Sequence, residues 1–461
     1  MSSEFDVVVI GSGPAGEKAA MQAAKLRHRV AVIERPGRLG GNCLHTATIP
    51  SKTLRETILY IAGVKQRSLY GIQTTLRKDL SVDDLMRRKE AVIGGQLEVL
   101  EHKLDRNAVT AVAGTARFLD PHRVEVLDGD GARRELTGRF IVIATGSRPA
   151  RDPAIPFDDE RVYDSDSILR LDRVPRTLTI VGAGVIGCEY ACMFAMLGTK
   201  VTLVDARARV LDFADAEIAE LLVARMREHG ITLRLGEEVA EVRRETTDRI
   251  VAETRSGKAV VGEKLLYAVG REGNTADLAL ERAGLRAGRR GLIEVNAQFQ
   301  TAVAHVYAVG DVIGFPSLAA TSMHQGRLAM AHAFGLPVNG EGTRLPYGIF
   351  TIPEISMVGE TEEQLTRARV PYEAGQAFFR EIARGEIIGD RAGMLKLLFE
   401  RASHRLRGVH IIGEKASELV HIGQAVLAFG GPIDYFVDTV FNYPTLSEAY
   451  KVAALNGLNR L

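Results

Sequence analysis

Two glycine-rich segments of the chain have the residue types and spacing needed to hold the phosphates of a dinucleotide. In the first, the apolar run 5–10 leads into Gly11, Gly13 and Gly16 and then into an alanine-rich helical pattern. Gly11 permits a tight turn, Gly13 lets the backbone approach a pyrophosphate, and Gly16 allows close packing of helix on strand. The N-terminus of the helix would face the phosphate charge. The segment therefore predicts a dinucleotide-binding turn.

An acidic residue follows this turn at the distance expected for a ribose ligand. The next predicted strand, 29–33, ends in Glu34, where a carboxylate can accept hydrogen bonds from ribose hydroxyls, and Arg35 joins it as a candidate binding residue. A glycine fingerprint alone is a weak signal, because an ordinary strand-to-helix turn uses the same glycines. Here strand, turn, helix and acid agree, which favours a nucleotide site.

The same pattern recurs in the middle of the chain. A predicted strand at 177–181 leads into Gly182, Gly184 and Gly187, and a further strand that starts at Lys200 ends in Asp205. Two accidental matches would both need the correct strand and helix context, so the repeat is stronger evidence than either turn alone. The sequence predicts two dinucleotide sites in one chain.

The residues after the second turn give opposite indications about the coenzyme. Asp205 could bind the ribose hydroxyls of NAD, whereas Arg207 and Arg209 could pair with the 2′-phosphate of NADP. Each arginine taken singly is better explained as solvated surface charge. Together with Asp205, the two arginines leave open a site that admits both coenzymes.

Composition limits the class of protein that must position these residues. The length of 461 residues suggests about three domains, and 46% hydrophobic residues are ample for their cores. A net charge of +1 without a basic block argues against nucleic acid. The first strand begins almost at Met1, and no apolar run is long enough for a bilayer, so we expect neither export nor a membrane partner. Three cysteines fit a reducing cytoplasm, and we expect no metal site.

A third group of residues surrounds Cys43. The segment 40–52, with Gly41, Cys43, Thr48 and Lys52, resembles the active-site helix of the FAD-dependent pyridine nucleotide-disulfide oxidoreductases. The resemblance extends along essentially the whole chain. Its further marks are Ile143–Gly146, Gly270–Arg271, Asn274–Thr275, Tyr307–Asp311 and Pro444–Glu448.

The resemblance implies an α/β fold with two Rossmann-like dinucleotide-binding domains and an α+β C-terminal dimerisation domain. The FAD-binding domain would span 1–148 and 273–344, with a charged helical region after Pro50 that includes 79–103. The NAD(P)-binding domain would span 149–272, and the dimer-interface domain 345–461. We expect a homodimer, and a larger homo-oligomer stays open.

The resemblance also implies roles for individual residues. FAD would be held non-covalently by the first turn, with Thr145 and Gly146 beside it and Asp311 on its ribityl chain. Lys52 and Glu189 would pair close to flavin N5, where the lysine charge raises the electron affinity of the flavin. The full candidate FAD set is Gly11, Gly13, Gly16, Glu34, Arg35, Gly41, Cys43, Lys52, Thr145, Gly146 and Asp311. The candidate NAD(P) set is Gly182, Gly184, Gly187, Asp205, Arg207 and Gly270.

Two departures remove the disulfide chemistry of the family. Its reductases carry C-x-x-x-x-C, but here Thr48 stands where the second cysteine would be. Cys188 and Cys192 fall on the helix after the second turn, where small apolar packing is the better interpretation. Tyr443 replaces the C-terminal histidine that deprotonates the thiol, although Glu448 is retained, and a phenol is a poor base at neutral pH.

A branch of the family without the disulfide shares Cys43, His45, Thr48 and the stretch Phe441–Thr445. This likeness implies hydride transfer from NADPH to FAD and then to NAD, in a ping-pong cycle that needs no acid or base. Thr46–Ala47 and Asp205 differ from the residues expected in this branch. These differences concern the specificity for NADP, not the fold.

Several alternatives remain open at this point. The acceptor could be a quinone or another small molecule, and the chain could be a lipoamide dehydrogenase-like flavoprotein without disulfide activity or a non-catalytic flavoprotein. Cys43 either fills space against the flavin or tunes it, and His45 is better explained as a positioned polar residue than as a base. By the resemblance, Tyr443 would lie opposite Cys43 of the partner subunit.

Overall fold

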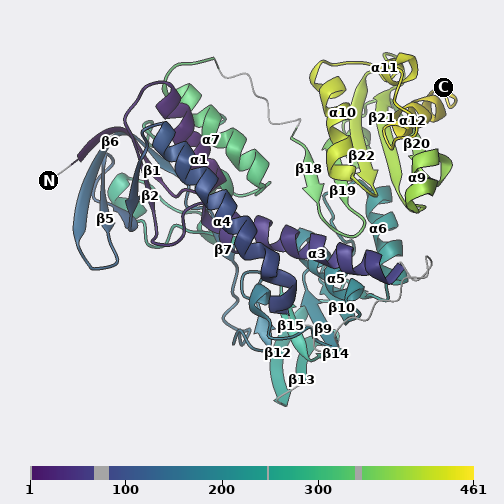
Figure 1. Ribbon diagram of the computed structural model, residues 1–461, viewed down its shortest axis with the longest axis horizontal. Coiled ribbons are helices and arrows are strands. Elements are labelled where there is room, and N and C mark those ends of the chain that lie inside the picture. Colours follow the sequence, from purple (N-terminus) through teal and green to yellow (C-terminus); the bar gives the residue numbers. More distant parts are fainter. Residues whose placement is uncertain (1–2, 67–81, 247–248, 338–344) are drawn as a thin grey trace. The chain divides into compact units, whose positions relative to one another are not determined.

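The computed structural model describes residues 3–66, 82–246, 249–337 and 345–461, which form two compact units (Figure 1). Unit 1 contains Met1–Arg151, Asp164–Arg173 and Gly270–Gly340, and unit 2 contains Asp152–Tyr163, Val174–Val269 and Glu341–Leu461. The predicted three-domain boundaries stay predictions, and residues 79–81 and 344, which were used in them, lie outside the described residues.

Unit 1 is built on a seven-stranded sheet whose first strand carries the first glycine turn. The strand order is β3-β2-β1-β6-β5-β4, with β17 also paired to β6. Strands β1, β2, β3, β6 and β17 run parallel, and β4 and β5 are antiparallel. The bounds are β1 (Ser3–Ile10), β2 (Val30–Glu34), β3 (Thr110–Ala113), β4 (Thr115–Phe118), β5 (Arg123–Leu127), β6 (Arg133–Ile143) and β17 (Val306–Ala308).

The central strands of this sheet carry apolar residues on both faces, and both faces are buried. Val7, Val8 and Val9 of β1 are all fully buried, as expected for a parallel strand with helices on its faces. On one face α1 (Pro14–Lys25) lies beside α7 (Ala319–Ala333) (Figure 1). A Cβ on Gly326 of α7 would overlap the carbonyl oxygen of Ala15. The two helices therefore approach closely only because position 326 is glycine.

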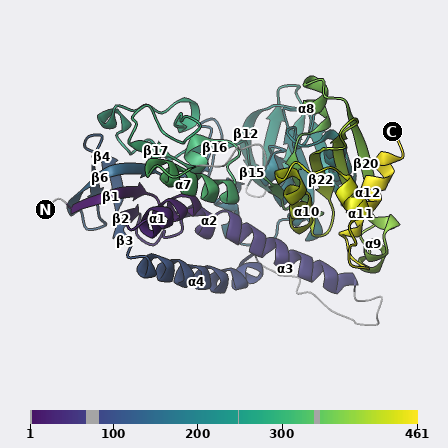
Figure 2. The same cartoon turned by 90° about the horizontal axis from the view of Figure 1, so that it is seen from above.

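The helices after β2 confirm the predicted helical region. They are α2 (Gly41–His45), α3 (Thr48–Gln66) and α4 (Val82–Arg106), and the last two lie alongside each other (Figure 2). Unit 1 is completed by the small antiparallel sheet of β7 (Ser147–Pro149) and β16 (Arg271–Gly273). No described helix is both long enough and apolar enough to cross a membrane.

Unit 2 contains the second glycine turn on a five-stranded parallel sheet in the order β11-β10-β9-β15-β8. Its helix α5 (Val185–Met196) is buried on nearly all sides, and Cys188 and Cys192 are both fully buried there, as expected for packing residues. The other elements are β8 (Val162–Tyr163), β9 (Thr177–Val181), β10 (Lys200–Asp205), α6 (Ala216–Glu228), β11 (Thr232–Leu235), β12 (Val239–Thr246), β13 (Arg249–Thr254), β14 (Ala259–Gly262) and β15 (Lys264–Tyr267).

The C-terminal part of unit 2 is an antiparallel sheet in the order β18-β19-β22-β21-β20, with helices packed against it. Its core includes Phe399, Phe436 and Tyr450, which are all fully buried. The elements are β18 (Tyr347–Ile349), β19 (Ile355–Gly359), α8 (Glu362–Arg367), β20 (Tyr372–Phe378), α9 (Ala383–Ile388), β21 (Met394–Glu400), β22 (Leu406–Ile412), α10 (Ala416–Ala428), α11 (Asp434–Asp438) and α12 (Glu448–Leu458).

Candidate functional site

The first glycine turn connects β1 to α1, and its geometry requires glycine at two of the three positions. Gly11 has φ of +104°, and a Cβ there would overlap the carbonyl oxygen of Ala144. A Cβ on Gly16 would overlap the carbonyl oxygen of Gly11. By contrast, a Cβ on Gly13 would have no protein atom within 4 Å. The turn therefore leaves open space at the position predicted to face a pyrophosphate.

Glu34 ends β2 with its carboxylate aimed at this turn. The backbone N–H and the hydroxyl of Ser12 each donate to Glu34 Oε2 at 2.9 Å, and the N–H of Arg35 donates to Oε1 at 2.9 Å. A carboxylate has about four acceptor sites, so one site of Glu34 is left over. The Arg35 side chain is mostly exposed, with Nε 4.0 Å from Glu34 Oε1.

Asp311 follows β17 and is hydrogen-bonded to the first residue of β7. The Ser147 hydroxyl donates to Asp311 Oδ2 at 2.7 Å, and Arg271 donates to the Ser147 hydroxyl and carbonyl at 2.8 and 2.9 Å. Asn42 of α2 donates to the same carbonyl at 2.7 Å. These bonds join four segments that are distant in sequence. They also fix the orientation of the Asp311 carboxylate.

Thr145 and Gly146 lie between β6 and β7, where Asn274 holds the backbone. The Asn274 side chain donates to the Thr145 carbonyl at 3.0 Å, and its N–H donates to the Gly146 carbonyl at 3.0 Å. Gly146 has φ of +67°, which favours glycine, and a Cβ there would meet no protein atom within 4 Å. Gly41 of α2 also has positive φ, and its Cβ would lie 3.0 Å from Gly13 Cα, so α2 begins against the turn.

Cys43 lies on α2, and Thr48 begins α3 after a short break. The Thr48 side chain is hydrogen-bonded to the Cys43 sulfur, so the two positions of the family's dithiol are adjacent. Burial raises the pKa of Cys43, and Asp311 and Glu17 raise it further, whereas the Thr48 hydrogen bond and the Lys52 charge lower it. The net result is a raised pKa, and the thiol stays protonated at neutral pH.

The break between α2 and α3 is occupied by the residues that depart from the expected branch pattern. The Thr46 hydroxyl donates to Asp166 Oδ2 at 3.1 Å, and Arg271 lies 3.7 Å from the other oxygen of this carboxylate. His45 Nε2 contacts the Leu39 carbonyl at 2.8 Å, so this nitrogen carries the proton. The contact fits a positioned polar residue, as the sequence favoured for His45.

The second glycine turn, between β9 and α5, repeats the geometry of the first. Gly182 has φ of +110°, and a Cβ there would lie 2.5 Å from the Ala268 carbonyl oxygen. A Cβ on Gly187 would overlap the Gly182 carbonyl oxygen. The space above Gly184 is open except for Arg207, whose Nη2 would lie 3.8 Å from a Cβ at position 184.

Asp205 ends β10 and is hydrogen-bonded to this turn. The Ala183 N–H donates to Oδ2 at 2.5 Å, and the Arg207 guanidinium donates to both oxygens through Nε at 3.0 Å and Nη2 at 2.8 Å. Burial acts to raise the pKa of Asp205, but the hydrogen bonds from Arg207 and Ala183 outweigh it and hold the pKa below its ordinary value. The carboxylate is therefore ionised at neutral pH.

Comparison with known proteins places these two turns and the Cys43 segment in one family. Residues 5–326 match the family model described as pyridine nucleotide-disulphide oxidoreductase, and residues 345–454 match the model of its dimerisation domain. The chain belongs to the pyridine nucleotide-disulphide oxidoreductase family. It is thus an oxidoreductase family member, and the fold predicted from the resemblance is confirmed.

Among curated members of the family, the soluble pyridine nucleotide transhydrogenase of Mycobacterium bovis (strain BCG / Pasteur 1173P2) is 52% identical, over 99% of this chain and 98% of that protein. The protein of the same name from Yersinia pestis (strain Pestoides F) is 47% identical over the same shares. The branch suspected from sequence is therefore confirmed by curated relatives.

Solved structures of the family agree with the fold along the whole chain. LpdA from Mycobacterium tuberculosis superposes with a TM-score of 0.91 at 28% identity, and the HOCl-induced flavoprotein disulfide reductase RclA from Escherichia coli superposes with a TM-score of 0.86 at 28% identity. Each comparison covers 98% of this chain and 99% of the other.

The predicted catalytic pair of the family, Lys52 and Glu189, is divided between the two units. Lys52 lies on α3 in unit 1, where its charge acts on Cys43. Glu189 lies on α5 in unit 2, is 4% exposed, and accepts a hydrogen bond at 2.8 Å from the N–H of Phe350. Gly270 is the first residue of its segment in unit 1, and its carbonyl accepts a bond from Ala150 at 3.0 Å. The roles assigned to Lys52, Glu189 and Gly270 stay predictions.

Tyr443 occupies the position of the family's histidine, and its side chain is 73% exposed in the described chain. Glu448, which would orient that histidine, begins α12 and keeps a buried Oε2 with no hydrogen-bond partner among the described residues. The exposed Tyr443 is compatible with the proposed place across a dimer, which stays a prediction.

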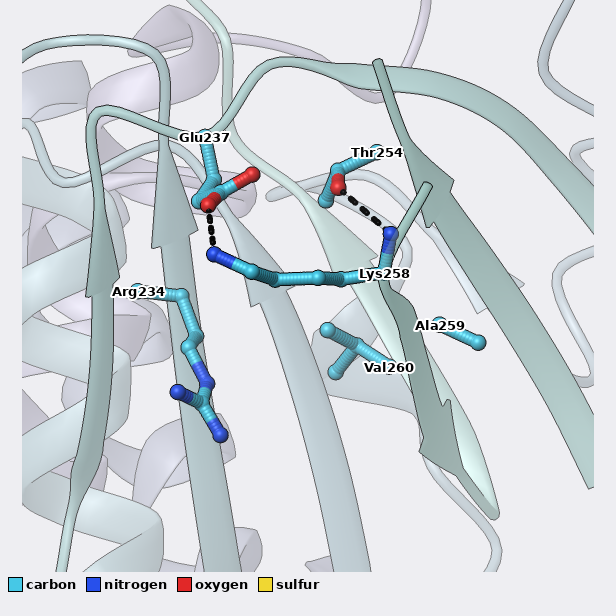
Figure 3. A pocket seen from close by; sticks show the side chains of 6 residues that line it. All are labelled: Arg234, Glu237, Thr254, Lys258, Ala259 and Val260. Atoms are coloured by element: carbon cyan, nitrogen blue, oxygen red, sulfur yellow. Dashed lines mark hydrogen bonds and ion pairs between the residues drawn. The ribbon is translucent and has the colours of Figure 1, made fainter. Parts of the chain in front are cut away.

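A pocket of about 290 Å³ lies at the end of β11, and the residues that line it are not among those predicted to bind a nucleotide (Figure 3). Lys258 reaches across it to Glu237, and the Thr254 hydroxyl accepts a bond from the Lys258 N–H at 3.3 Å. Glu237, which lines the pocket, is also bonded to the end of β10, since its N–H donates to the Asp205 carbonyl at 2.9 Å.

The sequence did not identify the residues that hold the predicted nucleotide-binding side chains in place. They are Ser12 at Glu34, Asn42 and Ser147 at Asp311, and Asp212 and Glu363 at the two arginines after β10. Ser12 and Asn42 carried a local signal, because Ser12 lies inside the glycine turn and Asn42 inside the segment 40–52. The others are brought to the site from distant segments or from a loop without a recognisable pattern.

Proposed function

We propose that this protein catalyses FAD-dependent hydride transfer between NADPH and NAD⁺. The observation that carries the proposal is the pair Cys43–Thr48, which cannot form the family's disulfide, in a chain 52% identical to a soluble pyridine nucleotide transhydrogenase. With no dithiol to receive electrons, a second nicotinamide nucleotide is the acceptor that the binding sites of this chain provide for.

The first site fits FAD in the arrangement of its donors and acceptors. Gly13 leaves room for a pyrophosphate, and Glu34 retains an acceptor site for a ribose hydroxyl. The carboxylate of Asp311, held by Ser147, suits the hydroxyl-rich ribityl chain. When bound, FAD supplies the carrier that takes hydride from one nicotinamide and returns it to another.

In this proposal the residues of the chain bind and orient the cofactors and adjust the electron affinity of the flavin, and none of them needs to move a proton. Lys52 would place a positive charge close to the flavin, and Glu189 would orient Lys52. Cys43 is a protonated thiol, so it would act by filling space and by adjusting the polarity beside the flavin. This fits the loss of the histidine at position 443, because hydride transfer needs no thiol to be deprotonated. We propose a ping-pong order in which one nicotinamide leaves before the next binds.

The second site would serve both NAD and NADP in turn. Asp205 offers a carboxylate for ribose hydroxyls, and Arg207 and Arg209 offer cations for a 2′-phosphate. A single site for both coenzymes suits a ping-pong cycle, because donor and acceptor would occupy the site in succession.

A homodimer is proposed for the active protein. The dimerisation-domain match at residues 345–454 supports it, as do the large apolar side chains exposed between α10 and α12. Phe429 is 91% exposed and Val440 is 90% exposed. Large apolar side chains that are exposed together are typical of a surface that binds another protein chain. We place the protein in the cytoplasm, where its three free cysteines would stay reduced.

The proposal is tested with purified protein that has a confirmed flavin spectrum. NADPH is supplied with a thionicotinamide analogue of NAD⁺, and lipoamide, oxidised glutathione and a quinone are compared as acceptors. We expect rapid reduction of the analogue and negligible reduction of both disulfides. Much faster reduction of the quinone would instead identify an NAD(P)H dehydrogenase, and efficient disulfide turnover would refute the argument from Cys43 and Thr48.

A further inference from the structure

The carboxylates at the ends of β2 and β10 differ in how many of their acceptor sites are occupied. Glu34 accepts three hydrogen bonds, two from Ser12 and one from Arg35. Asp205 accepts four, because the Arg207 backbone N–H also donates to Oδ1 at 2.7 Å, beside the guanidinium and Ala183. A carboxylate has about four acceptor sites. Asp205 is therefore saturated, whereas Glu34 is not.

Two of the four bonds on Asp205 come from the guanidinium of Arg207, in the two-pronged geometry that suits a carboxylate. The same guanidinium lies over Gly184, where the dinucleotide is expected. A ribose 2′-hydroxyl could donate to Asp205 only after this guanidinium moves away. The structure thus shows Asp205 in a covered state.

Asp212 is a second ionic partner for the Arg207 side chain. Nη1 of Arg207 donates to Asp212 Oδ1 at 2.9 Å, and Asp212 is about half exposed. Arg207 therefore spans two carboxylates, and it can leave Asp205 without losing all of its ionic contacts. A guanidinium carries five N–H donors, three of which are used in these side-chain bonds, so two remain for a phosphate.

Arg209, the second arginine, is paired with a residue from another part of unit 2. Its Nη2 lies 3.5 Å from Oε1 of Glu363, on the first turn of α8. The other oxygen of Glu363 is buried and has no hydrogen-bond partner among the described residues. Glu363 is therefore an acceptor that competes with any phosphate for Arg209.

We infer that Arg207 is a movable cover on Asp205, and that Asp212 and Glu363 set the balance between NAD and NADP by holding the two arginines. With Arg207 on Asp205, the acid is neutralised and the free N–H groups suit a 2′-phosphate. With Arg207 moved toward Asp212, Asp205 is exposed to a ribose hydroxyl. The inference rests on the proposed function, because it assumes that this turn binds a nicotinamide dinucleotide. Asp212 and Glu363 are positioning residues in this account.

The test measures binding of the two adenosine halves to the purified holoenzyme by calorimetry. Adenosine 2′,5′-bisphosphate represents NADP, and 5′-AMP represents NAD. Arg207→Met should weaken the bisphosphate about tenfold or more and leave 5′-AMP unchanged or tighter, because only the bisphosphate uses the guanidinium. Arg207→Lys should restore part of the bisphosphate affinity. Equal weakening of both ligands by Arg207→Met would overturn the inference.

The two positioning residues should give different patterns. Asp212→Asn keeps Arg207 on Asp205, so the bisphosphate should bind about two- to fivefold tighter and 5′-AMP weaker by a similar factor. Glu363→Gln releases only Arg209, so the bisphosphate should tighten by about the same factor while 5′-AMP does not change. Glu228→Gln, which removes an exposed carboxylate paired with Arg225 on α6, is the matched control and should change neither.

The outcomes separate this inference from the proposed function. Wild-type affinity ratios in Asp212→Asn and Glu363→Gln would overturn the roles of these two residues. If the wild type binds both half-ligands with the predicted variant patterns but passes no hydride from NADPH to the NAD⁺ analogue, the inference stands and the proposed function fails. If the wild type binds neither half-ligand, both fail.

Discussion

The Thr48 hydroxyl is hydrogen-bonded to the Cys43 sulfur, at the two positions where disulfide reductases of this family carry their paired cysteines. The short break between α2 and α3 brings the two side chains together although their helices are separate. The two side chains thus lie next to each other, but a threonine hydroxyl cannot form a disulfide with Cys43.

Replacing Thr48 should recreate a disulfide. In Thr48→Cys, the new sulfur would lie where the hydroxyl now contacts Cys43, within reach for a bond. After mild oxidation and unfolding, thiol titration of Thr48→Cys should find two reactive cysteines of the four present. The control Thr48→Ser should show three, because its cysteines stay free as in the wild type. Four reactive thiols in oxidised Thr48→Cys would contradict this account.

The raised pKa of Cys43 should make its thiol slow to alkylate. Burial is the main cause, and the nearby carboxylates of Asp311 and Glu17 add to it, so the neutral thiol is favoured over the thiolate. Because only the thiolate reacts, labelling by iodoacetamide should stay slow at pH 7 and rise steadily above about pH 9. Mass spectrometry locates the label, and Cys43→Ser is the control. Rapid labelling of Cys43 at pH 7 would show a lowered pKa instead.

Two glycines of the second turn should respond differently to alanine. Gly187→Ala places a methyl group against the Gly182 carbonyl, so unit 2 should lose stability and its apparent melting temperature should fall. Gly184→Ala adds a methyl group that meets only the flexible end of Arg207, at an ordinary contact distance of 3.8 Å, so the fold should persist while the nicotinamide dinucleotide binds more weakly. Thermal unfolding and NADPH titration separate the two effects. Normal NADPH affinity in Gly184→Ala would argue against this turn as the phosphate site.

Lys396 of β21 should matter for stability. Its side chain is fully buried, with Nζ 2.9 Å from Asp215 and 2.9 Å from Glu217, and it also contacts Glu362. Lys396→Met would leave three clustered carboxylates without their cation, at a cost of about 3–5 kcal/mol. The apparent melting temperature should fall by several degrees. The control Lys258→Met removes an exposed ion pair with Glu237 and should leave the apparent melting temperature close to that of the wild type.

The effect of Lys396→Met should also depend on pH. Burial acts to raise the pKa of Asp215, but its interactions with His410 and with the Lys396 cation, including the hydrogen bond from Lys396, outweigh burial, and the pKa lies below its ordinary value. A lowered pKa stabilises the fold above the unfolded-state pKa, about 3.9, and that stabilisation is lost as pH falls through the folded-state pKa. The difference between wild type and variant should therefore be full near pH 7 and narrow below about pH 4. A constant difference would exclude the ionic explanation.

Much of the fold and part of the site could be predicted from the sequence because the signals are local. Gly11 and Gly16 mark their turn through backbone constraints that act within a few residues, and Glu34 follows at the length of one helix and strand. The absence of a second cysteine at position 48 is visible directly in the sequence. β21 is buried along nearly its whole length, and the sequence did not predict the ion pairs of Lys396 there. A lysine in an apolar strand gives no indication of which acids will surround it.

The sequence by itself determined that two dinucleotide turns occur in one chain and that the disulfide relay is missing, because turn geometry and side-chain chemistry depend on nearby residues. It left undecided how Asp205 and Arg207 act together. Only the tertiary structure decided that Arg207 covers Asp205, and that Arg209 pairs with Glu363 from a segment 154 residues away. Such pairings depend on how α8 packs in unit 2, and a hydrogen bond or an ion pair forms only where folding brings its two partners within a few ångströms.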